Sequence, residues 1–341
     1  MEGMWMSSTR HDAGPRRKWS VGMAVYAVVV VIVVGLAVSQ SFIRAGASTT
    51  IRDKATFIAP AGAGGGWDTF MREAQAAARD HGLASTIQVR NVPGANGTIG
   101  LRQLNSLKGR PDVAMVGGSG IVAGEIEGNT SIHLTDMTPI ARVVEEYDVV
   151  LVPASSPYKT LKDLIAAWKK NPKAVPFTGG GSFDELVMAQ LAKAAGIDPK
   201  KVAYIPKSGG GEVAQALVTK TAAAALSGYP DVVDQIASGR LRALGIAAKE
   251  PLQGVKIPTL RSMGYDVTLA NWRAVFAPPG ISADEAGEIR DVFKSVTKTP
   301  EWSDAVKNYK WNPVWLEGPA FEKFLRNEYK VIGGLYEDLG K

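Results

Sequence analysis

From residue 56 to residue 341, short apolar runs alternate with longer stretches in which apolar residues recur every three or four positions. A short apolar run is typical of a buried strand, and the recurring spacing is typical of an amphipathic helix. Regular alternation of the two elements predicts an α/β fold with mostly parallel sheets. The pattern predicts strands at residues 56–59, 87–90, 113–116, 140–144, 149–152, 175–178, 202–205, 222–226, 241–247 and 274–277.

Helices are expected after most of these strands, and local signals mark their ends. The helix predicted at Asp68–His81 has Phe70 and Ala74 on one face and is followed by Gly82, a common helix stop. A Ser or Thr three residues before an acidic residue predicts a capping box at a helix start. This signal occurs at Thr160–Asp163, Ser182–Glu185 and Ser282–Glu285, and further helices are expected at Glu212–Thr219 and Phe321–Leu339.

Two glycine-rich loops each join a predicted strand to a predicted helix. Glycine leaves backbone N–H groups uncovered, and the first turn of a helix has N–H groups without intrahelical partners. Each loop can therefore bind an anion such as a carboxylate without help from Lys or Arg. The candidate ligand-binding residues are Ala61, Gly62, Gly64, Gly65, Gly66, Trp67 and Asp68 in the first loop, and Thr178, Gly179, Gly180, Gly181, Ser182, Phe183 and Asp184 in the second.

Several of these residues also have a purely structural interpretation. Asp68 and Ser182 are residue types that cap helices, and Trp67 is large enough to anchor its loop by packing. Three further glycine-containing segments are candidates for the wall of the site, with ordinary turns as the alternative. They are residues 117–120, 207–211 and 228–231.

The composition excludes several kinds of chemistry. The chain has 341 residues, no Cys, and 3 His that are far apart in sequence. It therefore has no disulfide, thiolate nucleophile or iron–sulfur cluster, and we expect no metal site and no cofactor. The net charge is +6, and residues 1–47 carry about half of it. The rest of the chain has no dense basic stripe, so nucleic-acid binding is not expected.

The first glycine loop does not match a dinucleotide-binding fingerprint. Gly62 and Gly64 have the right spacing, but Trp67 occupies the position of the third glycine. The next predicted strand ends in Arg90 and Asn91, with no acidic residue for a ribose, and the chain has no phosphate-binding GxxxxGK[ST] loop.

Residues 1–47 have the pattern of an export signal or a membrane anchor. Arg16–Lys18 precede an uncharged segment, residues 19–43, whose almost entirely apolar core is Val21–Val38. As a helix this core would be about 27 Å long, close to the roughly 30 Å of a bilayer interior. Ala45–Ala47 fits a signal-peptide cleavage site. Cleavage and retention both stay open, and either would place the rest of the chain outside the cytoplasm.

Short motifs recur along nearly all of residues 54–341. They are Pro60–Asp68, Asn91–Gly100, Thr138–Arg142, Ser156–Leu164, Gly179–Ser182, Ile205–Gly210, Gly239–Leu244, Ile257–Leu260 and Phe276–Gly280. Each motif is weak alone, and the series is specific. In its order and spacing, the series resembles the extracytoplasmic solute receptors of tripartite tricarboxylate transporters, also called the Bug or TctC-like family.

The resemblance implies a two-lobed fold like that of type II periplasmic binding proteins, with a ligand cleft between the lobes. We place the first lobe at residues 48–147 and 265–341 and the second at residues 148–264. The glycine loops, residues 61–68 and 178–184, would hold a ligand carboxylate through backbone amides and water. The resemblance further implies a non-enzymatic receptor that delivers its ligand to a carrier with one large and one small membrane subunit.

One position departs from the family pattern. Glu185 stands where the helix after the second loop often has His. Together with Asp184 it places two carboxylates in the first turn of that helix, which favours the helix but weakens an anion bound there. A monocarboxylate or a zwitterion therefore fits at least as well as a tricarboxylate, and the candidate ligands are di- or tricarboxylates, monocarboxylates and amino acids.

Two other functions remain open at this point. A ligand-sensing protein would bind the same solutes and present them to a membrane sensor. An extracellular hydrolase would need a nucleophile beside His81 or His133.

Overall fold

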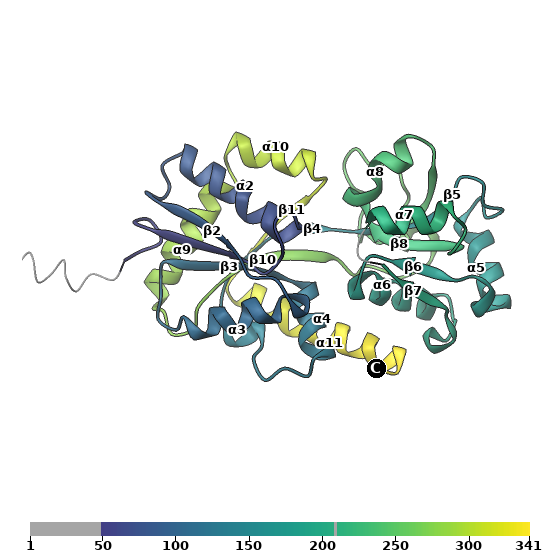
Figure 1. Cartoon of the computed structure of the whole chain (residues 1–341), viewed down its shortest axis with the longest axis horizontal. Coiled ribbons are helices and arrows are strands. Elements are labelled where there is room, and N and C mark those ends of the chain that lie inside the picture. Colours follow the sequence, from purple (N-terminus) through teal and green to yellow (C-terminus); the bar gives the residue numbers. More distant parts are fainter. Residues whose placement is uncertain (1–48, 208–209) are drawn as a thin grey trace, which may run out of the picture. The chain divides into compact units, whose positions relative to one another are not determined.

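The computed structural model describes residues 49–207 and 210–341, which belong to one unit, Thr49–Lys341 (Figure 1). The predicted signal or anchor lies outside the described residues. No helix among the described residues is both long and apolar enough to cross a membrane.

The first sheet has six strands in the order β11-β4-β10-β3-β1-β2. Strands β1, β2 and β3 form its parallel part, in which β1 lies between the other two. Strands β10, β4 and β11 join the sheet antiparallel to their neighbours. The bounds are β1 Ala55–Ala59, β2 Ile87–Asn91, β3 Val113–Gly118, β4 Thr138–Glu146, β10 Asn271–Ala277 and β11 Asn312–Glu317.

The second sheet has five strands in the order β7-β6-β8-β5-β9. Its parallel part is β7, β6 and β8, and β5 lies antiparallel between β8 and β9. The bounds are β5 Asp148–Pro153, β6 Phe177–Gly179, β7 Tyr204–Pro206, β8 Ala224–Gly228 and β9 Leu241–Ile246.

The expectation of mostly parallel sheets is wrong. Of the strand pairings among the described residues, four are parallel and five antiparallel. Every antiparallel pairing includes β4, β5 or β10, which are the strands next to the two passages between the sheets. A parallel pair needs a helical crossover within one sheet, and β5 and β10, which arrive from the other sheet, have none. Strand β11 follows β10 through α9 and α10 and runs in the same direction, so it is also antiparallel to β4. The α/β class itself is confirmed.

The helices follow the strands in the expected rhythm, with additional ones. The sequence pattern did not predict α3, α4, α8, α10 or strand β11. The helix bounds are α2 Gly66–Asp80, α3 Thr98–Ser106, α4 Ser119–Glu127, α5 Leu161–Lys170, α6 Ser182–Ala194, α7 Gly210–Val218, α8 Tyr229–Ala237, α9 Ala283–Val296, α10 Pro300–Asn308 and α11 Gly318–Leu339.

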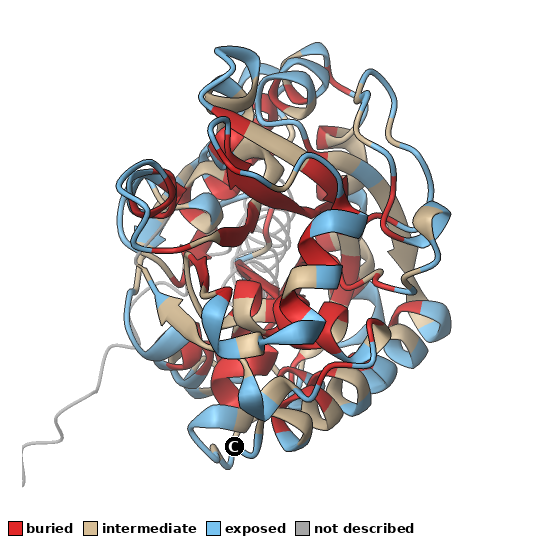
Figure 2. Ribbon diagram, turned by 90° about the vertical axis from the view of Figure 1, so that its right-hand side faces the viewer, coloured by how far each residue is buried: buried red, intermediate tan, exposed pale blue. Residues whose placement is uncertain are grey.

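Helices cover both faces of each sheet (Figure 1). In the first sheet, α2, α9 and α10 bury one face around Phe57 and Phe293, and α3, α4 and α11 bury the other. In the second sheet, α5 and α6 pack on one face, and α7 and α8 pack on the other. Buried residues line the strands, and exposed residues lie on the outer surfaces of the helices (Figure 2). One cluster of buried residues includes α4 and α11 of the first sheet and α5 and α6 of the second.

The chain passes twice between the two sheets. Tyr147 is the only residue between β4, in the first sheet, and β5, in the second. The return passage is the longer segment 247–270, between β9 and β10. Gln190 of α6 holds this segment, because its side-chain oxygen accepts hydrogen bonds from the N–H groups of Thr268 and Leu269, both at 3.2 Å.

Candidate ligand-binding site

The first glycine loop connects the end of β1 to α2 and is closed by a tight turn. The N–H of Gly65 donates to the carbonyl oxygen of Gly62 at 3.1 Å. Gly64 has a φ of +81°, a left-handed conformation that favours glycine. Gly65 is the N-cap of α2 and contributes no side-chain cap. The expectation that Asp68 caps this helix is therefore wrong, since Asp68 lies inside the first turn.

The side chain of Asp68 instead accepts hydrogen bonds from the loop and from its neighbours. Its Oδ2 accepts a hydrogen bond from the N–H of Gly64 at 2.8 Å and one from Arg72 Nε at 2.9 Å. Its Oδ1 accepts a bond from Asn91 Nδ2 at 2.8 Å, and the same Nδ2 also donates to the carbonyl of Ala61. Burial would raise the pKa of Asp68, but these hydrogen bonds outweigh it and lower the pKa overall. An ionised Asp68 thus fixes the shape of the loop.

Three amides at the start of α2 are left for another partner. Within the described residues, the N–H groups of Gly66, Trp67 and Asp68 have no acceptor, as expected for the first turn of a helix. Gly62, Ala63, Gly64 and Gly66 are exposed. The loop therefore presents a group of accessible donors at the positive end of a helix dipole, which suits an anion.

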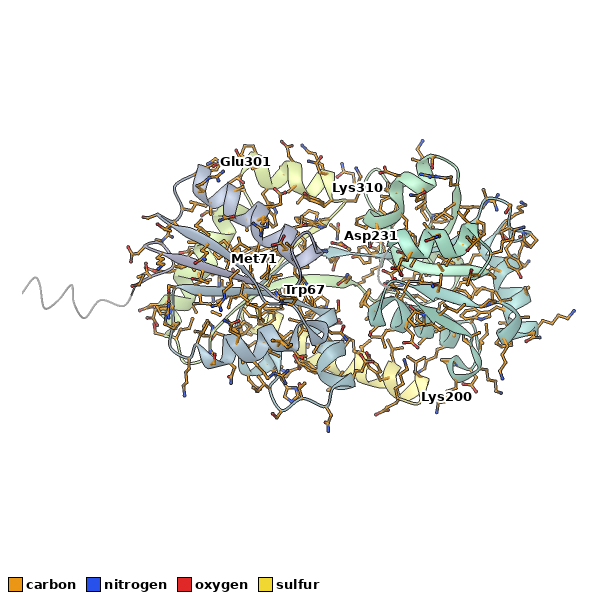
Figure 3. All side chains as sticks on the ribbon, viewed as in Figure 1. Trp67, Met71, Lys200, Asp231, Glu301 and Lys310 are labelled. Atoms are coloured by element: carbon orange, nitrogen blue, oxygen red, sulfur yellow. The ribbon has the colours of Figure 1, made fainter. Side chains whose placement is uncertain are left out.

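Trp67 anchors the loop to its neighbours. Its ring lies so close to Gly97 and Gly120 that a Cβ atom at these positions would be 2.8 and 3.3 Å from it, respectively. Both glycines belong to segments that follow other strands of the same sheet. The half-buried indole (labelled in Figure 3) thus packs against glycine backbones, which agrees with the anchoring interpretation.

The second glycine loop repeats this construction at the end of β6. The N–H of Gly180 donates to Asp184 Oδ2 at 2.6 Å, as that of Gly64 donates to Asp68 in the first loop. Gly181, with a φ of +142°, is the N-cap of α6. The predicted capping box at Ser182–Glu185 is therefore wrong, because Ser182 is already the first helical residue. The N–H groups of Gly181, Ser182 and Phe183 have no acceptor among the described residues.

The remaining candidates of the second loop form its support. Thr178, Gly179, Phe183 and Asp184 are buried, while Gly180, Gly181 and Ser182 are half-buried. Thr178 donates its hydroxyl to the carbonyl of Ile205 at 2.6 Å. Glu185 faces the C-terminus, where Lys341 Nζ donates to its Oε2 at 2.7 Å. Its charge is paired there, so Glu185 opposes an anion at the loop less than the sequence suggested.

The support of the second loop differs from that of the first in its chemistry. Where Asp68 has Arg72 and Asn91, Asp184 has the carboxyl group of Asp148 within hydrogen-bonding distance. Burial and the neighbouring acids raise the pKa of Asp148, and burial is the main cause of a pKa of about 7 for Asp184. Two carboxyl groups at such a distance share a proton, so this loop rests on a titratable pair.

Arg273 lies beside the first loop and was not predicted from the sequence. It is on β10, it is buried, and it pairs with Glu146 of β4. Its guanidinium carbon lies 5.2 Å from the centre of the Trp311 ring. A Cβ atom on Gly66 would come within 2.6 Å of Arg273 Nη2, so the guanidinium fills the space that the glycine leaves open.

Asp231 lies on α8, which packs on the second sheet, and its charge affects acids of both sheets. It is the third residue of α8 (labelled in Figure 3). Although the residue is exposed, partial desolvation of its carboxyl group raises its pKa, and the charge of Arg273 counteracts the rise. Asp231 in turn raises the pKa of Glu146, Asp148 and Asp184. The charge of Asp231 thus links Arg273, beside the first loop, with Asp184, which holds the second, although no hydrogen bond joins the two loops within the described residues.

No signal in the sequence ties these additional residues together. Asp148 and Arg273 each lie one residue before a predicted apolar strand, and nothing in the sequence marks them as site residues. Asn91 was noted only as a non-acidic residue at a strand end. Asp231 alone fell within a segment predicted for the wall of the site.

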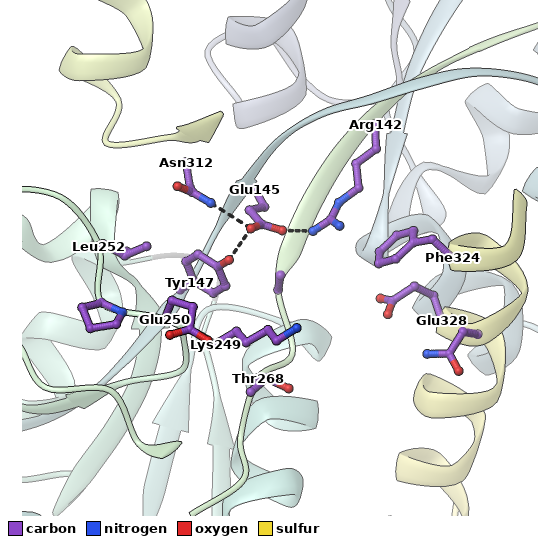
Figure 4. Close-up of a pocket in the computed structure, with 13 residues that line it drawn as sticks. Arg142, Glu145, Tyr147, Lys249, Glu250, Leu252, Thr268, Asn312, Phe324 and Glu328 are labelled. Atoms are coloured by element: carbon purple, nitrogen blue, oxygen red, sulfur yellow. Dashed lines mark hydrogen bonds and ion pairs between the residues drawn. The ribbon is translucent and has the colours of Figure 1, made fainter. Parts of the chain in front are cut away.

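A separate pocket of about 550 Å³ lies beside the β4–β5 passage (Figure 4). Glu145 is central there: it pairs with Arg142 and accepts hydrogen bonds from Tyr147 and from Asn312 Nδ2. Phe324 of α11 lies against the Arg142 guanidinium, 4.1 Å from ring centre to Cζ. None of the predicted site residues lines this pocket.

The histidines do not support hydrolase chemistry. His81 Nε2 lies 2.9 Å from Glu301, and His133 Nδ1 lies 3.0 Å from the buried Glu125. The polar partners of both rings found in the described part of the chain are thus carboxylates, not Ser or Thr hydroxyls. The same part of the chain holds no group of three His, Cys, Asp or Glu that could bind a metal ion.

Comparison with known proteins agrees with this architecture. The model of the tripartite tricarboxylate transporter family receptor matches residues 70–341. Protein BugT of Bordetella pertussis is 30% identical over 236 residues, covering 65% of this chain and 70% of BugT.

Two solved structures share the fold. A TctC solute-binding protein from Polaromonas, without ligand, superposes with a TM-score of 0.72 at 24% identity over 84% of this chain and 99% of that one. MatC of Rhodopseudomonas palustris with bound malate gives a TM-score of 0.67 at 20% identity over 83% and 98%. These matches confirm the two-lobed periplasmic-binding-protein fold, and the chain belongs to the tripartite tricarboxylate transporter receptor family.

Proposed function

We propose that this protein is an extracytoplasmic receptor that binds a small organic carboxylate between its two lobes and carries out no catalysis. The observation that carries the proposal is the pair of glycine loops. Each loop presents unpaired amides at a helix start. In each loop an aspartate accepts a hydrogen bond from the N–H of the glycine four residues earlier, which holds the loop in shape. Such preformed donors recognise a carboxylate with little ordering cost.

The comparisons support a receptor for this class of solute. The family is a receptor family, and MatC, a protein of the same fold, is recorded with malate. The donors available here are the backbone amides of the two loops. Each charge-assisted hydrogen bond contributes roughly 1.5–3 kcal/mol, so four of them allow about micromolar affinity after ordering costs.

We further propose that binding closes the two lobes and that the closed form docks on a membrane carrier with a large and a small subunit. The lobes would be residues 48–147 with 265–341, and residues 148–264. The ligand joins loops that belong to different lobes, so it stabilises the closed arrangement by its differential affinity for the two states.

A thermal-shift screen of the protein tests the receptor function. Mono-, di- and tricarboxylates and amino acids are added one at a time, and the unfolding temperature is recorded. A ligand at 100 times its dissociation constant stabilises the folded state by about 2.7 kcal/mol, which raises the transition by a few degrees. A shift confined to one class of carboxylate or amino acid supports the proposal, whereas a flat response to the whole panel contradicts it.

A further inference from the structure

The acids beneath the second glycine loop lack enough hydrogen-bond donors. Asp148 is only 1% exposed, and its Oδ2 has no hydrogen-bonding partner among the described residues. The groups that act on its carboxyl are three further acids, Asp184, Asp231 and Glu146. A buried polar atom without a partner costs free energy, so the cluster as it stands is incomplete.

The cation near this cluster is already engaged. Arg273 pairs with Glu146, and both side chains are buried. Arg273 also acts on Asp231, but no hydrogen bond or ion pair between the two is found. One guanidinium therefore pairs with Glu146 and acts on Asp231 by its charge, while Asp148 and Asp184 have no ion pair with a cation among the described residues. The site has more acids than cations.

Asp231 is the member of the cluster that a ligand can reach. It is exposed, and its side chain has no hydrogen-bonding partner in the described part of the chain. Its Cβ and Cγ atoms lie against Gly210, at the start of α7, where any side chain would collide with them. The absence of a side chain at Gly210 thus makes room for this carboxylate.

The first loop provides hydrogen-bond donors at the other end of the site. The amides of Gly66, Trp67 and Asp68 attract negative charge, and Arg273 lies directly behind Gly66. A ligand that reaches from these amides to Asp231 meets donors at one end and a carboxylate without a partner at the other. A ligand with carboxylates alone would place negative charge against Asp231, which is unfavourable.

We propose that the ligand is a zwitterion of the amino-acid type, with its carboxylate on the amides of the first loop and its ammonium group on Asp231. This inference rests on the proposed receptor function and specifies its ligand. The ammonium group brings three donors and one positive charge to a site that is short of both. Asp231 acts here as the specificity-determining residue.

The test measures affinities by titration calorimetry for matched pairs that differ only in the amino group. The pairs are L-glutamate with glutarate, L-leucine with 4-methylpentanoate, and 4-aminobutyrate with butyrate. We expect at least one aminated ligand to bind at least tenfold more tightly than its partner. In Asp231→Asn this preference should disappear, because the aminated ligand loses at least tenfold in affinity and the plain carboxylate does not.

Asp234→Asn is the matched control, since Asp234 is exposed on the same helix. It should bind like the wild type, and thermal unfolding checks that both variants fold. If plain carboxylates bind as tightly as their aminated partners, the proposal of a zwitterionic ligand is contradicted and the receptor function is not. An equal loss for both members of a pair in Asp231→Asn would assign Asp231 to lobe closure and also overturn it. Absence of binding by every probe would contradict the receptor function itself.

Discussion

At the scale of single residues, each glycine loop is held by one aspartate that binds a glycine amide four positions earlier. Asp68 binds Gly64 and Asp184 binds Gly180, at 2.8 and 2.6 Å. The carboxylate uses one amide of the loop and thereby fixes the direction of the others. The two anchors differ in their second partner, because Asp68 faces Arg72 and Asn91 while Asp184 faces Asp148.

Gly66→Ala should weaken ligand binding at least tenfold with a smaller effect on stability. The new Cβ would lie 2.6 Å from Arg273 Nη2, and Arg273 is fixed by Glu146 and Trp311. Displacing a packed group costs typically 1–3 kcal/mol, which ligand titration and chemical denaturation measure separately. Gly287→Ala on α9 is the control, since it lies outside the loop and a Cβ there has nothing within 4 Å. Equal binding by the two variants would contradict the placement of the ligand carboxylate at Gly66.

Asp148→Asn should make the protein more stable above pH 7 and flatten the dependence of its stability on pH. The pKa of Asp184 is raised to about 7 and that of Asp148 is also raised, so the folded state retains protons that the unfolded chain loses near pH 4. Stability is therefore full below that pH and falls as the pH rises to about 7, by at most about 1.4 kcal/mol per pH unit for one proton.

The asparagine amide replaces the shared proton by a permanent donor to Asp184. Asp231 and Glu146 also act on Asp148 by their charge, so the variant relieves that repulsion as well. Denaturation at pH 5 and pH 8.5 measures the combined effect. A variant whose stability follows the wild type at both pH values would show that no proton is shared at this pair.

At the scale of elements, the hydrophobic pattern identified every strand except β11, as short apolar runs, and it identified the long helices that bury one clear face. Helix α4 was missed since most of Ser119–Glu127 is buried and its apolar residues are not confined to one face. Helix α8 was missed because Gly228 and Pro230 indicate a turn, although proline also fits the first turn of a helix. The capping box at Ser182 failed because the left-handed Gly181 starts the helix one residue earlier.

Gln190→Ala tests how α6 holds the return passage between the sheets. The side-chain oxygen accepts hydrogen bonds from two successive backbone N–H groups, those of Thr268 and Leu269. Without it both amides lose their partner, so we expect a loss of about 1–3 kcal/mol in the free energy of unfolding. Hydrogen exchange at Thr268 and Leu269 should accelerate together, which mass spectrometry detects. The Lys193→Ala variant on the same helix removes only an exposed ion pair and should change stability by less than about 1 kcal/mol.

At the scale of the whole molecule, the site combines residues that are distant in the chain. The two glycine loops were predictable, because a loop signal and a helix signal adjoin in the sequence at both places. Arg273, Asp148 and Asp231 were not, since their proximity depends on β10 entering the first sheet antiparallel and on β5 lying beside β8. Sequence spacing carries no information about either pairing.

Ligand binding should reduce the radius of gyration if the lobes close as proposed. Small-angle scattering with and without a ligand found in the thermal screen measures this change. Gly66→Ala should show a smaller reduction at a ligand concentration that only just saturates the wild type. An unchanged radius in the saturated wild type would mean that binding proceeds without lobe closure.

Closure of the lobes about Tyr147, the single residue between β4 and β5, should change the protonation of the acids on either side of it. Glu146 before it pairs with Arg273, and Asp148 after it faces Asp184. A rotation about Tyr147 moves these two acids relative to each other and so changes how firmly their protons are held. The receptor should then exchange protons with the medium each time it captures its solute. Calorimetry in buffers of different ionisation enthalpy counts those protons, so the movement can be followed without any label.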